Sequence, residues 1–191
     1  MSRVKKIVVI GTSGAGALAA KMAKKLDPSV DVTVIRKEDE KGLLTRCAIP
    51  YIASGDVMVD ACFKDDEEFH EQGIKLVTMK AVKVDRDEKK VVTADGATYP
   101  YDKLILATGA SPIIFPIPGI ELAGVFTLRK AGDAVKMSDW INTNRVRNLV
   151  VVGAGAIGLE TSYLLARKGI KVTIIEMLEH IMQRALDADM S

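Results

Sequence analysis

The chain has 191 residues, of which 48% are hydrophobic and 27% are charged. Its length corresponds to one full domain and part of another, and its abundant apolar residues exclude a disordered, collagenous or coiled-coil protein. Its 27 Lys+Arg against 25 Asp+Glu leave a net charge of +2, which is too balanced to indicate a nucleic-acid partner.

Two cysteines, Cys47 and Cys62, are too few for a disulfide scaffold or a four-ligand zinc site, so we expect no metal and a reducing, cytoplasmic setting. No apolar run reaches the roughly 18–20 residues that cross a bilayer, so we expect no membrane partner. The apolar run Ile7–Ile10 is also shorter than the roughly 7–15 residues of a signal-peptide core.

The sequence contains an internal repeat. Its first copy, Lys6–Arg36, begins with a predicted buried strand over Ile7–Ile10. A glycine loop follows, then an amphipathic helix over about Gly14–Leu26 and a second strand over Val32–Ile35. This strand–helix–strand order is typical of a parallel sheet.

The glycine loop of the first repeat, Gly11–Gly16, departs from the G-x-G-x-x-G fingerprint of dinucleotide sites. Ser13 stands where the middle glycine is expected, and serine is small enough to leave a phosphate room to approach. Arg36 ends the second strand, where an acidic residue would accept hydrogen bonds from a ribose. A guanidinium cannot accept such bonds, although it can pair with a phosphate, so nucleotide binding here is predicted from the fingerprint alone.

Between the two repeats the sequence pattern changes. Val82–Asp85 and Val91–Thr93 flank a charged turn and predict a β-hairpin or meander arm, and Leu104–Ala107 predicts another buried strand. Two prolines inside Ile113–Pro118 indicate an extended linker, because proline cannot donate to a sheet ladder. Lys130–Asn142 predicts a helix.

The second repeat, Asn148–Glu176, has the same order as the first. A strand over Leu149–Val152, a helix over Ala156–Lys168 and a strand over Val172–Ile175 surround a second glycine loop. The glycines of the two loops keep a constant offset of 142 residues (153 − 11 and 158 − 16). Two βαβ units therefore predict two dinucleotide sites.

The loop of the second repeat is a complete G-x-G-x-x-G directly after an apolar strand. Gly153 allows the tight turn, Gly155 lets backbone amides approach a pyrophosphate, and Gly158 permits close packing of helix on strand. Glu176 ends the next strand and can accept hydrogen bonds from a ribose diol. The alternative is that these glycines only pack a helix against a sheet.

Three segments in this order resemble the flavoprotein disulfide reductases with two dinucleotide folds, the pyridine nucleotide-disulfide oxidoreductase family. They are Gly11–Gly16, Tyr101–Pro112 and Gly153–Glu160. The resemblance covers essentially the whole chain. It implies that the first repeat holds the ADP half of FAD, that Thr108 and Gly109 close over it, and that the second repeat holds NAD(P)H.

The segment Cys47–Gly55 is similar to the Cys-Gly/Ala-Leu/Ile-Pro-Tyr segment of the single-cysteine branch, which contains coenzyme A disulfide reductases, NADH oxidases and NADH peroxidases. Cys62 lies 15 residues further on (62 − 47), which excludes the Cys-x4-Cys branch. A thiolate at a helix N-terminus is the nucleophile of thiol–disulfide exchange, so Cys47 is the predicted catalytic residue. A plain buried cysteine is the alternative.

Within that branch the electron acceptor stays open. NADH oxidases and peroxidases place a histidine in the first glycine loop, where this chain has Gly14, and coenzyme A disulfide reductases lack that histidine. Leu18 and Met22 nevertheless stand where the latter have polar coenzyme A contacts. Lys25 alone keeps a basic character suited to a phosphate and is the predicted substrate residue.

The cofactor-binding residues that follow from the motifs and the resemblance are Gly11, Ser13, Gly14, Ala15, Gly16, Arg36, Val82, Thr108 and Gly109 at the first site and Gly153, Gly155, Ile157, Gly158, Glu160 and Glu176 at the second. The expected cofactors are FAD and NAD(P)H. NADH is the preferred nucleotide, because the carboxylate at the end of the second repeat repels a 2′-phosphate.

The predicted fold is α/β: a Rossmann-like parallel sheet for FAD with a β-meander, and the first βαβ of a second Rossmann-like domain for NAD. The predicted boundaries are 1–112 for the N-terminal part of the FAD domain, 113–147 for a linker and connecting helix, and 148–191 for a truncated NAD(P) domain. We expect the complete protein to be a homodimer.

The predicted function is an FAD-dependent oxidoreductase that oxidises NAD(P)H and reduces a small-molecule disulfide, such as coenzyme A disulfide, or oxygen or peroxide, through Cys47. The alternative is a truncated, non-catalytic dinucleotide-binding module. Family members continue past this point, so we expect a fragment, a truncated reading frame or a subunit completed by another chain. The isolated chain is expected to bind FAD weakly and to self-associate.

Overall fold

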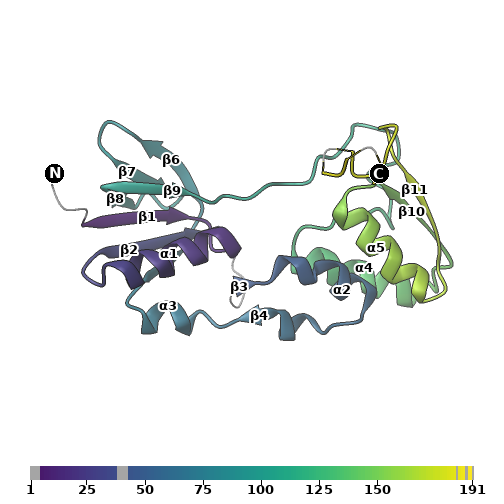
Figure 1. Cartoon of the computed structure of the whole chain (residues 1–191), viewed down its shortest axis with the longest axis horizontal. Coiled ribbons are helices and arrows are strands. Elements are labelled where there is room, and N and C mark those ends of the chain that lie inside the picture. Colours follow the sequence, from purple (N-terminus) through teal and green to yellow (C-terminus); the bar gives the residue numbers. More distant parts are fainter. Residues whose placement is uncertain (1–4, 38–42, 184, 188, 191) are drawn as a thin grey trace. The chain divides into compact units, whose positions relative to one another are not determined.

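The computed structural model describes residues 5–37, 43–183, 185–187 and 189–190. They form two compact units (Figure 1). The first unit takes its residues from 1–45 and 63–110, and the second unit from 46–62 and 111–191. Each repeat of the sequence lies in its own unit.

The first unit is built on a four-stranded parallel sheet with the order β5-β2-β1-β9. Its strands are β1 (Lys6–Ile10), β2 (Asp31–Arg36), β5 (Lys75–Thr78) and β9 (Lys103–Leu106), and α1 (Gly14–Leu26) connects β1 to β2. The predicted bounds of α1 are confirmed, and β5 was not predicted. The sheet confirms the predicted Rossmann-like parallel sheet for this half of the chain.

One face of this sheet is covered by α1 and by α3 (Glu67–Glu71). Because side chains alternate along a strand, Val9 and Val34 point into this core, where they meet Ala20 of α1 and Phe69 of α3. Each of these four side chains is buried. The core therefore holds the start of α1 at the carboxyl ends of the strands.

A three-stranded antiparallel meander covers the other face of the sheet (Figure 1). It consists of β6 (Ala81–Asp85), β7 (Lys90–Thr93) and β8 (Thr98–Pro100). Val91 of β7 is fully buried against Val8 and Ile35 of the parallel sheet. The predicted hairpin or meander arm is therefore a meander, with β8 as its third strand.

A short antiparallel pair, β3 (Leu43–Leu44) and β4 (Phe63–Lys64), brackets the segment that belongs to the second unit. That segment comprises a 3₁₀ turn over Arg46–Ala48, α2 (Ile49–Ser54) and a second 3₁₀ turn over Val59–Cys62. The predicted boundaries put this segment in the FAD domain. Its contacts group it with the second unit, while the boundaries of the functional domains stay a prediction.

The second unit contains β10 (Asn148–Val152), α5 (Ala156–Arg167) and β11 (Lys171–Ile175), with β10 parallel to β11. This confirms the predicted second βαβ. The preceding helix, α4 (Ala131–Thr143), packs with α5 around α2. Among the described residues, no helix is long and apolar enough to cross a membrane.

Candidate functional site

The glycine loop of the first unit lies against the segment that follows β9. The amide of Ala107 donates to the carbonyl oxygen of Ile10 at 2.8 Å. A Cβ added to Gly11 would lie 2.0 Å from the carbonyl oxygen of Ala107, and Gly11 has a φ of +109°. The fold thus brings together two segments predicted to share one ligand, and glycine is required where they touch.

Gly16 is required for a second reason. A Cβ on it would lie 1.9 Å from the carbonyl oxygen of Gly11, so only glycine lets α1 pack this closely on the loop. Gly14, by contrast, has no heavy atom within 4 Å of its virtual Cβ. The space beside the first turn of α1 is open, as a pyrophosphate held by helix-end amides requires.

Ser13 occupies the middle position of the first loop without backbone strain. It is the N-cap of α1 with φ −73° and ψ −176°, and Gly155 is the N-cap of α5 with φ −80° and ψ 177°. Any residue can adopt this extended backbone, so the second glycine of the fingerprint is not needed for the turn. In the second loop, glycine at this position leaves open space beside the turn.

Three other predicted residues of the first site lie outside the glycine loop. Gly109 has a φ of +68° in the exposed segment after β9, beside the exposed Thr108. Val82 is exposed on β6, at the point where the register between β6 and β7 shifts. Lys25 is in the last turn of α1, eleven residues from Gly14 and therefore about 16 Å along the helix axis. Its predicted substrate role has no support from this position.

Arg36, at the end of β2, is buried and forms an ion pair. Its two terminal nitrogens donate to the two carboxylate oxygens of Asp66, at 2.8 and 2.6 Å. We predicted that this guanidinium could pair with a phosphate. In the structure it is paired with a carboxylate of its own chain.

The loop of the second unit repeats the geometry of the first. Gly153 has a φ of +103°, and a Cβ on Gly158 would lie 2.1 Å from the carbonyl oxygen of Gly153. Nothing lies within 4 Å of a Cβ built on Gly155. The exposed Ile157 follows in the first turn of α5. The residues present therefore fit a dinucleotide pyrophosphate at both loops.

Glu176 follows β11 and holds the second loop in place. Its carboxylate accepts hydrogen bonds from the amides of Ala154 at 2.7 Å, Met177 at 2.7 Å and Leu178 at 2.9 Å. These bonds lower the pKa of the Glu176 carboxyl, and the bond from Leu178 contributes most. The group is therefore ionised at neutral pH. A negative charge therefore stands at the strand end, where a ribose was predicted to bind.

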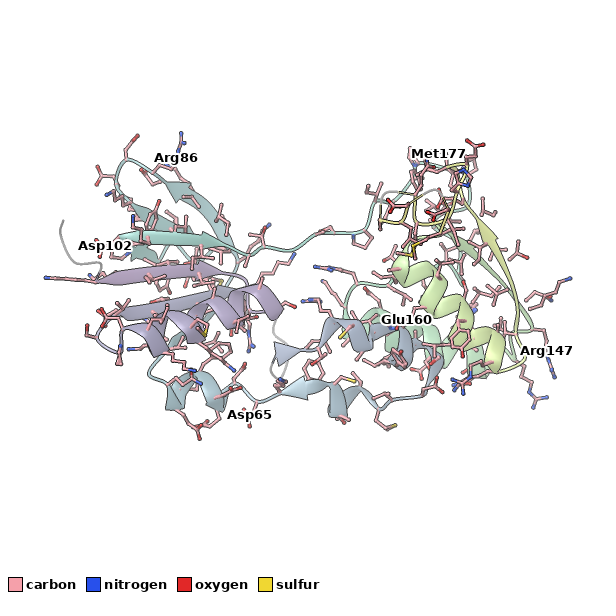
Figure 2. The ribbon with its side chains drawn as sticks, viewed as in Figure 1. Asp65, Arg86, Asp102, Arg147, Glu160 and Met177 are labelled. Atoms are coloured by element: carbon pink, nitrogen blue, oxygen red, sulfur yellow. The ribbon has the colours of Figure 1, made fainter. Side chains whose placement is uncertain are left out.

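Cys47 is exposed in the 3₁₀ turn that leads into α2. The carboxylate of Glu160 on α5 (labelled in Figure 2) raises the pKa of the hydroxyl of Tyr51, four residues on, through hydrogen bonding first and through its charge second. Cys62 is buried, and its burial, with a smaller contribution from the charge of Cys47, raises the pKa of its thiol. The exposed thiol is therefore the one available for exchange.

Two residues of this arrangement were not among the predicted site residues. Tyr51 lies one helical turn after Cys47, a spacing that places both on one face of a helix and could have indicated its role. Asp66 carries no comparable signal, because it is 30 residues from the arginine with which it pairs. Only the packing of α3 against the sheet brings the two together.

The profile of the pyridine nucleotide-disulphide oxidoreductase family matches residues 5–191. The chain belongs to this family. Its curated relatives include the NADH oxidase of Methanocaldococcus jannaschii, which is 37% identical over 97% of this chain. The CoA-dependent NAD(P)H sulfur oxidoreductase of Pyrococcus abyssi is 35% identical over 99% of this chain. The chain covers 43% of each relative, so it spans less than half of their length.

Solved structures agree with this assignment. The reduced CoADR-RHD of Bacillus anthracis is 29% identical, with a TM-score of 0.87 over 99% of this chain and 35% of its own. The NAD-dependent persulfide reductase of A. fulgidus is 35% identical, with a TM-score of 0.84 over 97% of this chain and 36% of its own. Both confirm that the two βαβ units and the meander form the fold of this family.

Proposed function

We propose that this chain is the nucleotide-binding part of an FAD-dependent NAD(P)H oxidoreductase whose redox-active thiol is Cys47. The observation that carries the proposal is the pair of equivalent glycine loops, each at the N-terminus of a helix and each with open space beside it. The exposed thiol ahead of α2 adds a nucleophile. Because the chain spans 43% of its relatives, the activity is proposed for the protein that contains it.

The two loops would hold different nucleotides. Gly14 and Ser13 would face the pyrophosphate of FAD in the first unit, with Thr108 and Gly109 beside it, and Gly155 and the first turn of α5 would face that of NAD(P)H. Amides at a helix N-terminus stabilise such a charge without a side chain. When bound, the flavin would supply the hydride-transfer chemistry that oxidises the nicotinamide.

The chain's own chemistry centres on the thiol of Cys47. As a thiolate it attacks one sulfur of a disulfide, the other sulfur leaves as a thiolate, and a mixed disulfide remains on the cysteine. Two electrons from NAD(P)H would then cleave that bond, restoring the Cys47 thiolate and releasing the second half of the substrate as a thiolate. Packing of α2 against α5 keeps the cysteine turn in place within the second unit.

A disulfide or persulfide is the favoured acceptor, and oxygen or peroxide is the second choice. Gly14 stands where NADH oxidases were expected to carry a histidine, so the first loop offers no acid–base group for oxygen chemistry. Relatives of both kinds are similar to this chain: one is named an NADH oxidase and another a CoA-dependent sulfur oxidoreductase. Coenzyme A disulfide and oxygen are therefore the two substrates to compare.

The test is NADH-dependent reduction of coenzyme A disulfide by the complete protein, with flavin absorbance recorded on the same sample. Cys47→Ser should abolish the reduction, whereas the matched variant Cys62→Ser should retain it, because the second thiol is buried. Full activity in Cys47→Ser would contradict the role of this residue. A colourless protein that binds NADH would instead support the non-catalytic module.

NADH should bind to the second unit more tightly than NADPH, by about tenfold. The ionised carboxylate of Glu176 can accept from a ribose diol and repels a 2′-phosphate. Dissociation constants for the two nucleotides measure this preference, and Glu176→Gln should reduce it. A lower constant for NADPH in the unmodified chain would contradict the assignment.

A further inference from the structure

The ion pair between Arg36 and Asp66 stands at the position where the second repeat has its acidic residue. In the first unit the amide of Gly11 donates to the carbonyl of Ile35 at 2.8 Å, and in the second unit the amide of Gly153 donates to the carbonyl of Ile175 at 2.8 Å. Arg36 is the next residue after the first of these carbonyls. Glu176 is the next residue after the second.

The carboxylate that the first repeat lacks in its own strand is thus supplied by another segment. Asp66 lies directly before α3, and each of its oxygens accepts one hydrogen bond from the guanidinium. Each carboxylate oxygen has two acceptor sites, so one on each oxygen is left for a further donor. The side chain is 21% exposed, whereas the side chain of Arg36 is only 6% exposed. A ligand can therefore reach the carboxylate, and the arginine lies beneath it.

Arg36 has a further guanidinium donor, Nε, besides the two terminal nitrogens that bind Asp66. Its Nε is buried and has no hydrogen-bond partner among the residues that the structure describes. Buried donors are nearly always paired in folded proteins, so this one is available to an acceptor that the described residues do not supply. A ribose hydroxyl can donate to the carboxylate of Asp66, and the arginine holds that carboxylate in place.

We propose that Asp66, positioned by Arg36, recognises the adenosine ribose of the dinucleotide in the first unit. The inference rests on the proposed function, which places the ADP half of FAD at this loop. The arginine is a positioning residue, because it acts through the carboxylate that it orients. The pair carries no net charge, so it selects for hydroxyl groups without the repulsion that a lone carboxylate exerts on phosphates.

A comparison of two ligands that differ only in their ribose hydroxyls tests this role. We would titrate the chain with ADP and with 2′,3′-dideoxy-ADP, in the presence of saturating NADH to fill the second unit, by isothermal calorimetry. Loss of the two hydroxyls should weaken binding to the unmodified chain by about tenfold or more. The ratio of the two affinities is the readout, because a purely structural role of the pair would leave it unchanged.

The informative variant is the double substitution Arg36→Leu with Asp66→Ala. It removes both charges together, so no unpaired charge is left in the core, and such replacements are often tolerated. We expect its affinity ratio to fall to about one. Asp65→Asn, which changes the neighbouring carboxylate, is the matched control and should keep the ratio of the unmodified chain.

Asp66→Asn extends the test, because it keeps the shape of the side chain and should lower the ratio by severalfold. A tenfold ratio that persists in the double variant, or a ratio near one in the unmodified chain, overturns the inference alone. Absence of ADP binding to the unmodified chain overturns the proposed function of the first unit and the inference with it.

Discussion

At the scale of single residues, the glycines of the two loops are not equivalent. The backbone requires some of them and does not require the middle one. Gly11 and Gly153 have positive φ, and Gly16 and Gly158 leave no space for a Cβ, so the fold itself requires them. The middle position has an ordinary extended backbone, and serine fills it in the first unit. The fold therefore requires the first and third glycines of each loop and does not require the middle one.

A matched pair of variants in the second loop tests this separation. Gly158→Ala should lower the free energy of unfolding of the second unit by about 1–3 kcal/mol, because its Cβ would meet a backbone oxygen that cannot move away. Gly155→Ser should change it by less than about 0.5 kcal/mol, because serine is a good N-cap. Its affinity for NADH should stay within about threefold. Chemical denaturation and NADH titration measure both, and equal destabilisation by the two variants would contradict the argument.

Asp102 makes the stability of the first unit depend on pH. Its carboxylate, labelled in Figure 2, accepts from the amides of Lys5 at 2.8 Å and Lys6 at 2.9 Å, and these bonds lower its pKa below 3.8. A carboxyl with a lower pKa in the folded than in the unfolded chain stabilises the fold above its unfolded pKa. That contribution is lost as the pH falls through the folded pKa.

Asp102→Asn should therefore lower the melting temperature at pH 7 and cost progressively less below about pH 4. Thermal unfolding of both proteins between pH 7 and pH 3 measures this convergence. Asp87→Asn, in the exposed turn between β6 and β7, is the control and should lower the melting temperature by less at every pH. A constant difference between wild type and Asp102→Asn across the range would show that the hydrogen bonds do not depend on the ionised carboxylate.

At the scale of elements, α2 is held by its surroundings. A helix of six residues is not stable by itself, and α2 packs against both α4 and α5. At its C-terminal end, Lys168 forms an ion pair with Asp56 at 2.9 Å. The turn that carries Cys47 is thus placed by the packing of the second unit.

Ile52→Ala should lower the free energy of unfolding of the second unit by about 2–4 kcal/mol. Its side chain is only 3% exposed, so truncation leaves a cavity between the helices. Met58→Ala is the control, because this side chain is 77% exposed and its loss should cost less than about 0.5 kcal/mol. Denaturant titration compares them. A similar cost for both variants would show that α2 is not anchored by its buried face.

At the scale of the whole molecule, the β10–β11 sheet has one covered face and one open face. Val151 lies 3.3 Å from a Cβ built on Gly158 of α5, so its alternating neighbours Val150 and Val152 point the other way. Both are exposed, as is Ile175, which pairs with Val152 in the ladder. An apolar sheet face of this kind favours association.

The isolated chain is therefore expected to self-associate, and Val150→Lys with Val152→Lys should shift it toward the monomer. Sedimentation velocity over a range of concentrations measures the change, with Thr98→Lys, exposed on β8 of the first unit, as a control for added charge away from this face. A monomer at every concentration before substitution would contradict the prediction. The companion expectation of weak FAD binding can be measured on the same samples by flavin fluorescence.

Most of the fold follows from local sequence patterns. Apolar runs and glycine spacing predicted both βαβ repeats, and α1 begins and ends where the pattern indicated. The strand β5 and the helix α3 were missed, because each is short and neither shows a clear hydrophobic period. The grouping of 46–62 with the second unit was missed for a similar reason, since it depends on contacts that are distant in sequence.

The sequence by itself determined the family, the two glycine loops and the cysteine turn, because those features are written in residues that lie close together in the chain. Only the tertiary structure decided the ion pair of Arg36 with Asp66 and the approach of Tyr51 to Glu160. The partners of those two residues come from other elements, 30 or more positions away. Which donor meets which acceptor at such separations is set by how helices pack on sheets and on one another, and no local pattern encodes it.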